Sequence, residues 1–376
     1  MSNNNIVWVD FNTMESFIID VFKELEVSEE DAKICANVLI ASDKRGINSH
    51  GIARLKTMYY DRIKSGLLSP KTNVEIVREG PTTAVIDGHN GMGQVIAKKS
   101  MALAIKKASK YGLGMVAVRN SAHYGIAGYY SLMAINENMI GITGTNSRPS
   151  VAPTFGVEAM LGTNPLTFGI PSDEKFPFVL DCSTSVTSNG KIEVYNSFGK
   201  DLPENWVIDN QGKSILNANQ AIKNIHSSGG GEAALLPLGG PGEENAGYKG
   251  YGYATVVEIL STALQGGQFL KTSTEEKDRN IGHFFIAINI SNFIDIELFK
   301  KTTGNILRSI RASKKIPGQN KIYTAGEKEY LVWLERKDKG VPVNEILQKQ
   351  IIAIRNELGL KNYNFLFKPL KDSKRQ

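Results

Sequence analysis

The chain has 376 residues, 41% of them hydrophobic, which is enough for one large domain or two smaller ones. It contains no apolar run of about eighteen residues or more, and its first residues lack the pattern of a secretory signal, so we expect a cytoplasmic protein without membrane contact. The formal net charge of +6 comes partly from Lys and Arg between residues 361 and 376. No alternation of aromatic and basic residues accompanies this charge, which argues against nucleic-acid binding and favours a small anionic ligand.

The first 65 residues have the periodicity of helices. Asn12 resembles the first residue of a capping box, and apolar side chains recur at helical spacing after it. Ser28, which precedes a run of acidic residues, predicts the start of a second helix. Residues 49–65 predict a third helix, which would carry His50 and Arg54 near its beginning.

From residue 73 to about 190, short β-rich runs alternate with Gly, Asn and Pro, a pattern typical of a mixed α/β domain. Residues 225–250 are rich in Gly and predict a long functional loop in front of a helix at 251–265. The predicted strands are 74–77, 83–87, 114–118, 139–144, 166–170, 177–181 and 283–288, with further helices near 92–111 and 295–312 and a last strand and helix within 320–359.

We therefore expect a smaller helical part formed by residues 1–72, packed with the C-terminal segment from about 300 to 376, and a mixed domain formed by residues 73–299. No strand leads into Gly-x-Gly-x-x-Gly at a helix start, which disfavours a classical Rossmann site. The sequence also lacks a P-loop, a nucleophile elbow and a zinc-binding His-Glu-x-x-His helix. Two cysteines, Cys35 and Cys182, are too few to indicate a disulfide framework.

Two histidine clusters carry the chemical signal. In residues 49–54, a helix would place His50 and Arg54 on one face, where one side chain can bind a carboxylate while the other exchanges a proton. In residues 120–125, His123 follows a buried run that predicts a strand ending at a cleft. Both clusters suit a small anionic substrate. We expect His89 and His226 to be loop residues and His283 to have a structural role in a strand.

Several short motifs follow one another along nearly the whole chain. They are Ser-His-Gly at 49–51 with Arg54, Asp-Gly at 87–88 with Gly91, Gly93 and Gln94, residues 120–125, Thr-Asn-Ser at 145–147, Gly-Thr-Asn-Pro at 162–165, Asp-Cys-Ser-Thr-Ser at 181–185, residues 235–240, and Gly-Tyr-Lys-Gly-Tyr-Gly at 247–252. In this order they resemble the type 2 malate/L-lactate dehydrogenases, a family that includes ureidoglycolate and sulfolactate dehydrogenases and cyclic imine reductases.

The resemblance implies a mixed α+β fold: a non-Rossmann NAD(P)-binding domain with a large, mainly antiparallel sheet, a smaller helical domain and assembly as an intertwined homodimer. It implies NAD or NADP as cofactor, and we expect no metal site. His123 would be the general acid/base and His50 would share the catalytic site. The implied substrate contacts are Ser49, His50, Arg54 and a tyrosine, and the implied cofactor contacts are Asn146, Ser147, Asp181, Cys182, Ser183, Lys249, Gly326 and Glu327.

Some details depart from the family pattern. The segment 55–61 is one residue longer than in many relatives, so the substrate-facing tyrosine is Tyr59 or Tyr60, and we expect Tyr59. Ala325 stands where the family usually has a proline, so this turn lacks the φ restraint of proline.

Other roles stay open for several of these residues. Arg54 could instead pair with Asp61, Lys249 could be a solvated loop lysine, and Cys182 could be a packed thiol. Asp181 could cap the turn that follows it. If Asp181 meets the adenine ribose, its charge would repel a 2′-phosphate and favour NAD.

The expected activity is hydride transfer between NAD(P) and a small 2-hydroxy or 2-oxo acid, with malate/oxaloacetate first and L-lactate, ureidoglycolate and sulfolactate as neighbouring choices. Imidazole titrates near neutral pH and can take the hydroxyl proton during oxidation and return it during reduction. A guanidinium can hold the carboxylate through two parallel hydrogen bonds. The alternatives are a cyclic imino acid reductase and, from another class, a non-catalytic binder of anions or nucleic acid.

Overall fold

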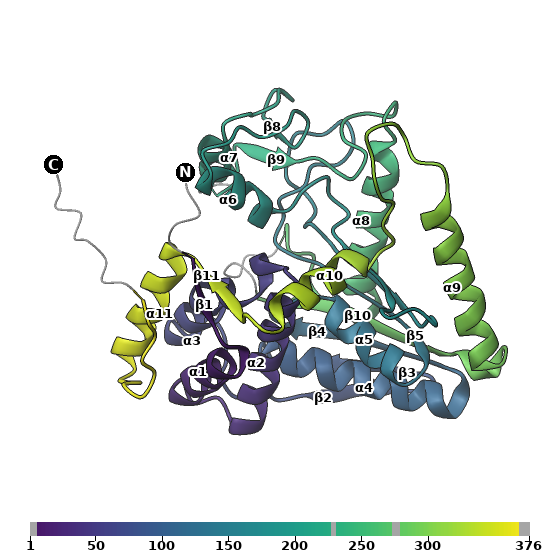
Figure 1. Ribbon diagram of the computed structural model, residues 1–376, viewed down its shortest axis with the longest axis horizontal. Coiled ribbons are helices and arrows are strands. Elements are labelled where there is room, and N and C mark those ends of the chain that lie inside the picture. The colour runs from purple at the N-terminus through teal and green to yellow at the C-terminus, as the bar shows by residue number, and fades with distance from the viewer. Residues whose placement is uncertain (1–5, 227–230, 273–278, 368–376) are drawn as a thin grey trace.

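The computed structural model describes residues 6–226, 231–272 and 279–367, and its centre is a seven-stranded sheet (Figure 1). Strands β3 and β4 run parallel, and all other neighbouring strands of this sheet are antiparallel. The prediction of a mixed fold with a large, mainly antiparallel sheet is therefore confirmed. The order across the sheet is β2 (Glu75–Glu79), β3 (Thr83–Asp87), β4 (Leu113–Ser121), β10 (Ile281–Asn289), β5 (Met139–Thr145), β6 (Leu166–Ile170) and β7 (Phe178–Cys182).

Helices cover both faces of this sheet. Helices α4 and α5 pack on one face through an apolar cluster that includes Phe285 of β10. Because side chains alternate along a strand, Gly282 faces the opposite side, where a Cβ would lie 1.6 Å from the carbonyl oxygen of Ser261 in α8. Helix α8 begins at Gly247 and not at residue 251, so the Gly-rich segment supplies its first turn. The bounds are α4 (Gly93–Tyr111), α5 (Gly128–Asn136) and α8 (Gly247–Ser261).

The helical part contains both ends of the described chain (Figure 1). Strand β1 pairs antiparallel with β11, and Ile351 and Phe365 join the same hydrophobic cluster as Phe17. The exact division at residues 72 and 299 stays a prediction. The elements are β1 (Val7–Val9), α1 (Phe11–Glu24), α2 (Glu29–Lys44), α10 (Glu327–Arg336), β11 (Val341–Val343) and α11 (Glu345–Glu357).

The first two helices show how local side chains set a helix start. Ser28 caps α2 as predicted, because its Oγ accepts the N–H of Asp31 at 3.2 Å. The predicted cap at Asn12 is wrong. Helix α1 begins at Phe11, and Asp10 caps it by accepting the N–H of Thr13 at 2.9 Å.

A third group of elements, which the sequence patterns did not predict, lies above the sheet in Figure 1. The two strands of this group have only three residues each, which is too short to show a clear period. They pack through Ile192, Leu202 and Leu235, together with Ala254 of α8. Residues 227–230 of the predicted Gly-rich loop lie outside the described residues. The elements are α6 (Asn189–Ser197), β8 (Val207–Asp209), α7 (Ala218–Ile225) and β9 (Ala233–Leu235).

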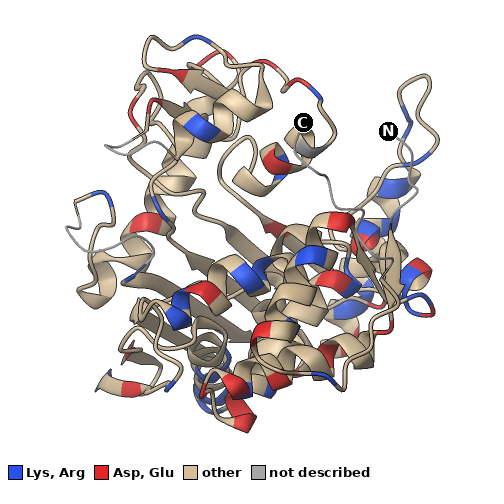
Figure 2. Cartoon of the chain, turned by 90° about the vertical axis from the view of Figure 1, so that its left-hand side faces the viewer, with Lys and Arg blue, Asp and Glu red and all other residues tan. Residues whose placement is uncertain are grey.

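Positions of Lys and Arg (blue) and of Asp and Glu (red) are interspersed along the ribbon in Figure 2. Helix α9 (Ile296–Ala312) stands at one margin of the molecule and is joined to the loop before β7 by ion pairs of Arg308 with Asp173 and Glu174. None of the described helices has both the length and the apolar composition that crossing a bilayer requires.

Candidate active site

The first histidine cluster lies on a series of short turns, so the single helix predicted for residues 49–65 is wrong. The turns are 3-10 in η1 (Asn48–His50) and η2 (Ile52–Arg54) and π-helical in η3 (Leu55–Tyr60), followed by α3 (Asp61–Lys64). A π turn is wider than an α turn and often occurs at functional sites. This π turn lies within segment 55–61, where the additional residue stays a prediction.

A buried carboxylate fixes the break between the first two turns. Asp43 of α2 is 1% exposed and accepts the backbone N–H of Ile52 at 2.8 Å. A Cβ at Gly51 would lie 2.1 Å from Oδ1 of Asp43, so the contact requires glycine at this position. Burial raises the pKa of Asp43 to about 7, against the opposing effects of the Ile52 hydrogen bond and Arg336. Asp43 was not predicted as a site residue, and the glycine that follows His50 is its one local signal in the sequence.

Short hydrogen bonds hold the side chains of this segment. Arg54 donates from Nε to the carbonyl oxygen of Ser49 at 2.6 Å, and its Nη2 lies 3.4 Å from Oε2 of Glu193 in α6. The Oγ of Ser49 lies 2.9 Å from Nδ1 of His50. Ser49, His50 and Arg54 are all partly exposed, so a small anion can reach them. The alternative partner considered for Arg54, Asp61, pairs with Lys56 at 2.7 Å instead.

The second cluster brings His123 to the same place from the end of β4. The rings of His50 and His123 are stacked with centroids 5.6 Å apart. The hydroxyl of Tyr59 lies 2.7 Å from Nδ1 of His123, and the backbone N–H of Gly125 reaches the same nitrogen at 3.3 Å. Because protein groups occupy Nδ1, Nε2 is the nitrogen of His123 that remains for a substrate.

Both imidazoles are neutral near pH 7. Burial, followed by the charges of His50 and Arg54, holds the pKa of His123 well below its usual 6.5. Burial and then Arg54 lower the pKa of His50 to about 4. A neutral ring can accept a proton, so His123 has the protonation state that a general base needs.

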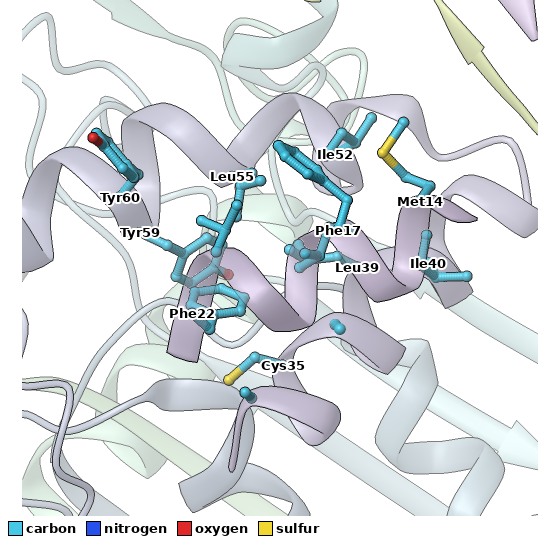
Figure 3. Packing of buried hydrophobic residues seen from close by; sticks show 14 of the residues in the cluster. Met14, Phe17, Phe22, Cys35, Leu39, Ile40, Ile52, Leu55, Tyr59 and Tyr60 are labelled. Carbon is cyan, nitrogen blue, oxygen red and sulfur yellow. The ribbon is translucent and has the colours of Figure 1, made fainter. Parts of the chain in front are cut away.

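Tyr59 lies on the buried side of His123, next to Nδ1 of its ring. Its side chain has no exposed surface and packs edge-on against Phe22 with ring centroids 6.0 Å apart, beside Leu55 and Cys35 (Figure 3). Tyr60 points elsewhere: burial and then the nearby carboxylate of Glu357 raise its pKa to about 12. Of the two tyrosines, Tyr59 is the one that meets the histidine, and the hydroxyl contact is to His123 and not to open space.

A pocket of about 590 Å³ begins next to this site, at Ile126, and two of the expected cofactor residues line it. Asp181 accepts the N–H of Gly128 at 2.7 Å and the hydroxyl of Thr167 at 3.0 Å, so it caps the start of α5 and not the turn after it. Gly326 has φ +88°, and a Cβ there would lie 2.5 Å from the carbonyl oxygen of Pro177. The rest of the lining includes Lys44, Arg45, Lys175, Phe176, Tyr323, Lys328, Tyr330 and Trp333.

Asn146 and Ser147 lie in a separate buried network at the end of β5. Asn146 is 1% exposed, and its amide donates to Glu258 of α8 at 3.0 Å while its oxygen accepts the N–H of Gly282 at 2.9 Å. Asn164 donates to the other oxygen of Glu258 at 2.8 Å and accepts the N–H of Ser147 at 3.2 Å. The side chain of Asn146 is thus engaged within the protein. Glu258 was not predicted as a site residue, because in the sequence it looks like an ordinary polar position of a helix.

The remaining expected cofactor residues are not gathered in that pocket. Lys249 is exposed in the first turn of α8, near the ring of Tyr248. Glu327 is 5% exposed, pairs with Lys321 at 2.7 Å and accepts the N–H of Thr324, so it stabilises the start of its own helix. Cys182 has an exposed thiol, and Ser183 donates from Oγ to the carbonyl oxygen of Ser185 at 3.2 Å.

Comparison with known proteins gives a consistent result. The family described as malate/L-lactate dehydrogenase matches residues 9–352. The malate dehydrogenase of Pyrococcus horikoshii is 45% identical over 361 residues, which cover 96% of this chain and 98% of that protein. The L-sulfolactate dehydrogenase of Methanocaldococcus jannaschii is 41% identical over 355 residues, which cover 94% and 97%.

The crystal structure of malate dehydrogenase from Entamoeba histolytica is similar with a TM-score of 0.92 and 43% identity, covering 96% of this chain and all of that one. This match spans nearly the whole chain. The chain therefore belongs to the malate/L-lactate dehydrogenase family and is an oxidoreductase that acts on 2-hydroxy acids.

Proposed function

We propose that this dehydrogenase interconverts malate and oxaloacetate with His123 as the general acid/base. The observation that carries the proposal is the stack of His50 and His123, with ring centroids 5.6 Å apart, next to the partly exposed Arg54. Two relatives that are 45% identical to this chain are named malate dehydrogenases, which supports the choice of malate among 2-hydroxy acids.

In this mechanism Arg54 binds the carboxylate next to C2 and thereby orients the reacting carbon. During oxidation, Nε2 of His123 takes the proton of the C2 hydroxyl. Nε2 has a free lone pair only when the neutral ring keeps its proton on Nδ1, so Nδ1 donates to the Tyr59 hydroxyl both before and after Nε2 takes the proton. The bound carboxylate raises the proton affinity of His123, so the ring is more readily protonated before reduction and has a proton to donate. Ser49 and His50 contribute further polar contacts to the anion.

The family implies a nicotinamide cofactor, which supplies the hydride acceptor or donor. The pocket beside Ile126 fits such a group, because it combines aromatic walls with Lys and Arg side chains and borders the segment that carries His123. We propose that it takes the adenosine end of the cofactor. Asp181 lines it, and a 2′-phosphate near that carboxylate would be repelled, which supports NAD over NADP. Asn146, Ser147 and Lys249 are proposed to lie along the nicotinamide end.

We also propose a homodimer, in which the partner covers two exposed apolar helix faces. On α8, Tyr248, Val256 and Ile259 are 48%, 50% and 52% exposed and lie on one side of the helix. On α9, Leu298, Ile306 and Ile310 are similarly exposed. Faces of this kind mark interaction surfaces. Analytical ultracentrifugation tests the dimer, and a wild type that sediments as a monomer would contradict it. The cytoplasmic location stays a prediction.

Steady-state kinetics test the activity. Oxaloacetate, pyruvate, a sulfonated 2-oxo acid and a cyclic imino acid are each offered with NADH and with NADPH. We expect the highest kcat/KM with oxaloacetate and NADH. A higher value with any other substrate would overturn the malate assignment, and a higher value with NADPH would overturn the choice of NAD.

A further inference from the structure

His283 lies at the centre of the large sheet, on the strand between β4 and β5. It pairs with Val118 on one side and with Thr145 on the other. Its side chain has no exposed surface and points to the face covered by α4 and α5, among the rings of Tyr124 and Phe285. None of the steps proposed above uses this imidazole.

Both ring nitrogens of His283 are engaged, each with a different strand end. Nδ1 lies 2.7 Å from the Oγ1 of Thr145, and Nε2 lies 2.9 Å from the Oγ of Ser121. The hydroxyl of Thr145 donates its one hydrogen to a backbone carbonyl oxygen, and that of Gly282 lies at 2.9 Å. Towards Nδ1 of His283 the same hydroxyl can therefore only accept. Burial, against an opposing hydrogen bond with the backbone of Ala122, lowers the pKa of His283 to about 3, so the ring is neutral. With its one proton on Nδ1, Nε2 accepts from the Ser121 hydroxyl.

These two contacts reach the two segments that the reaction depends on. Ser121 is the last residue of β4, two positions before His123. Thr145 ends β5 and directly precedes Asn146 and Ser147. In addition, the ring of Tyr124 lies flat on His283, with centroids 4.4 Å apart and an interplanar angle of 2°. One imidazole therefore touches the segments that precede and follow His123 and the segment that precedes Asn146.

We propose that His283 is a positioning residue: it bridges the ends of β4 and β5 and so sets the placement of His123 relative to the loop at residues 146–147. The inference rests on the proposed function, in which His123 moves the proton and that loop lies along the nicotinamide. A purely apolar side chain could fill the same space between aromatic rings, but it would leave the hydroxyls of Ser121 and Thr145 without this shared partner.

Two substitutions separate the two arms of the bridge. Asn places its polar atoms near the position of Nδ1, so His283→Asn keeps a partner for Thr145 and loses Ser121. Gln reaches further, so His283→Gln keeps a partner for Ser121 and loses Thr145. We expect the first variant to lower kcat about tenfold with little change in cofactor Kd, and the second to weaken NADH binding about tenfold, the effect of one net hydrogen bond.

The matched control is Phe285→Leu, which removes a ring from the same face of the same strand and from the same aromatic cluster. It should lower Tm while leaving kcat and cofactor Kd within about twofold of wild type. If kcat and cofactor affinity fell in all three variants in proportion to the fall in Tm, His283 would only fill the core, and the inference would be overturned. Wild-type values in both His283 variants would also overturn it.

Ser121→Ala and Thr145→Val approach the same bridge from its outer ends and keep the ring in place. Ser121→Ala should reproduce His283→Asn, and Thr145→Val should reproduce His283→Gln, so the test stands even where a His283 variant fails to fold. NADH binding is followed by fluorescence titration and does not require turnover. A wild type that binds NADH but ignores oxaloacetate therefore refutes malate as substrate, while the binding data from Thr145→Val and Ser121→Ala still decide this inference.

Discussion

Residues 48–60 bring Ser49, His50 and Arg54 to the site on short irregular turns, whereas His123 follows directly from a strand in the middle of the sheet. The turns depend on individual side chains, above all on the contact of Asp43 with the N–H of Ile52. The strand end depends on the backbone ladder that joins β4 to β10 and β10 to β5.

This difference separates binding from chemistry. The substrate-binding half can change locally, because one residue added to a π turn or one altered side chain leaves the sheet intact. The proton-transfer half is tied to the most buried strands, so its geometry changes only if the centre of the sheet changes. We expect substitutions in the first half to alter KM and those in the second half to alter kcat.

The largest effect is expected at the strand end. His123→Ala removes the proposed general acid/base, and kcat should fall about a hundredfold or more, the usual contribution of such a group. Stopped assays with oxaloacetate and NADH measure the loss, and thermal unfolding checks that the fold persists. Full activity in a folded His123→Ala protein would refute the role given to this residue.

Arg54→Lys tests the substrate-binding half. Lysine keeps the charge but cannot make two parallel hydrogen bonds to a carboxylate, so kcat/KM for oxaloacetate should fall about ten- to a hundredfold, mainly through KM. The control is Glu193→Gln, which removes the exposed partner of Arg54 and should stay within about threefold of wild type. A lysine variant with wild-type KM would mean that another group holds the carboxylate.

Tyr59→Phe links the two halves, because Tyr59 sits on the irregular segment while its hydroxyl lies on His123. Loss of this one hydrogen bond should lower kcat about tenfold and leave the oxaloacetate KM nearly unchanged. Tyr60→Phe is the matched control and should retain wild-type kcat. If Tyr59→Phe raised KM alone, Tyr59 would be a substrate contact, as expected from the sequence, and not a partner of the base.

Asp43→Asn should have the smallest effect on turnover and a clear one on stability. The pKa of Asp43 is about 7 in the folded protein, and about 3.9 for an unperturbed aspartate. The folded state therefore binds more protons between these values, so the contribution of Asp43 to the free energy of unfolding falls as pH rises from about 4 to 7. Asn keeps the oxygen that accepts the N–H of Ile52 and does not titrate.

Urea unfolding of wild type and Asp43→Asn at about pH 5 and about pH 8 isolates this contribution. His50 and His123, with lowered pKa values, give an opposite slope in both proteins, which cancels in the difference. The variant should gain stability relative to wild type as pH rises. The same difference between the two proteins at both pH values would show that Asp43 does not titrate in this range.

The sequence was informative where one local pattern settles the structure. The capping serine at Ser28, the strands of the large sheet and the position of His123 at a strand end all follow from periodicity and turn residues. The family resemblance added the activity, because the motifs are short and separately weak but occur in a fixed order. Fold class and family were both predicted correctly.

What the sequence could not show are contacts between distant residues. The turns at 48–60 depend on the hydrogen bond between Asp43 and Ile52, which are nine residues apart in sequence. Asp181 accepts the N–H of Gly128, which is 53 residues away in sequence. The network of Glu258 with Asn146 and Asn164 joins a helix to two loops. From helical periodicity alone, residues 49–65 look like one continuous helix. The periodicity contains no information about the Asp43 side chain, which accepts the backbone N–H of Ile52.

The pairing of β1 with β11 has a consequence for how the protein is made. Val9 finds its partner Val341 only when the chain as far as Val341 has left the ribosome, on the order of tens of seconds after Val9 itself emerges. Until then the first two helices lack both this strand pair and the apolar side chains of α11 that complete their cluster. The sheet can assemble earlier from β2 to β10, so the substrate-binding half of the site is the last to be completed during synthesis.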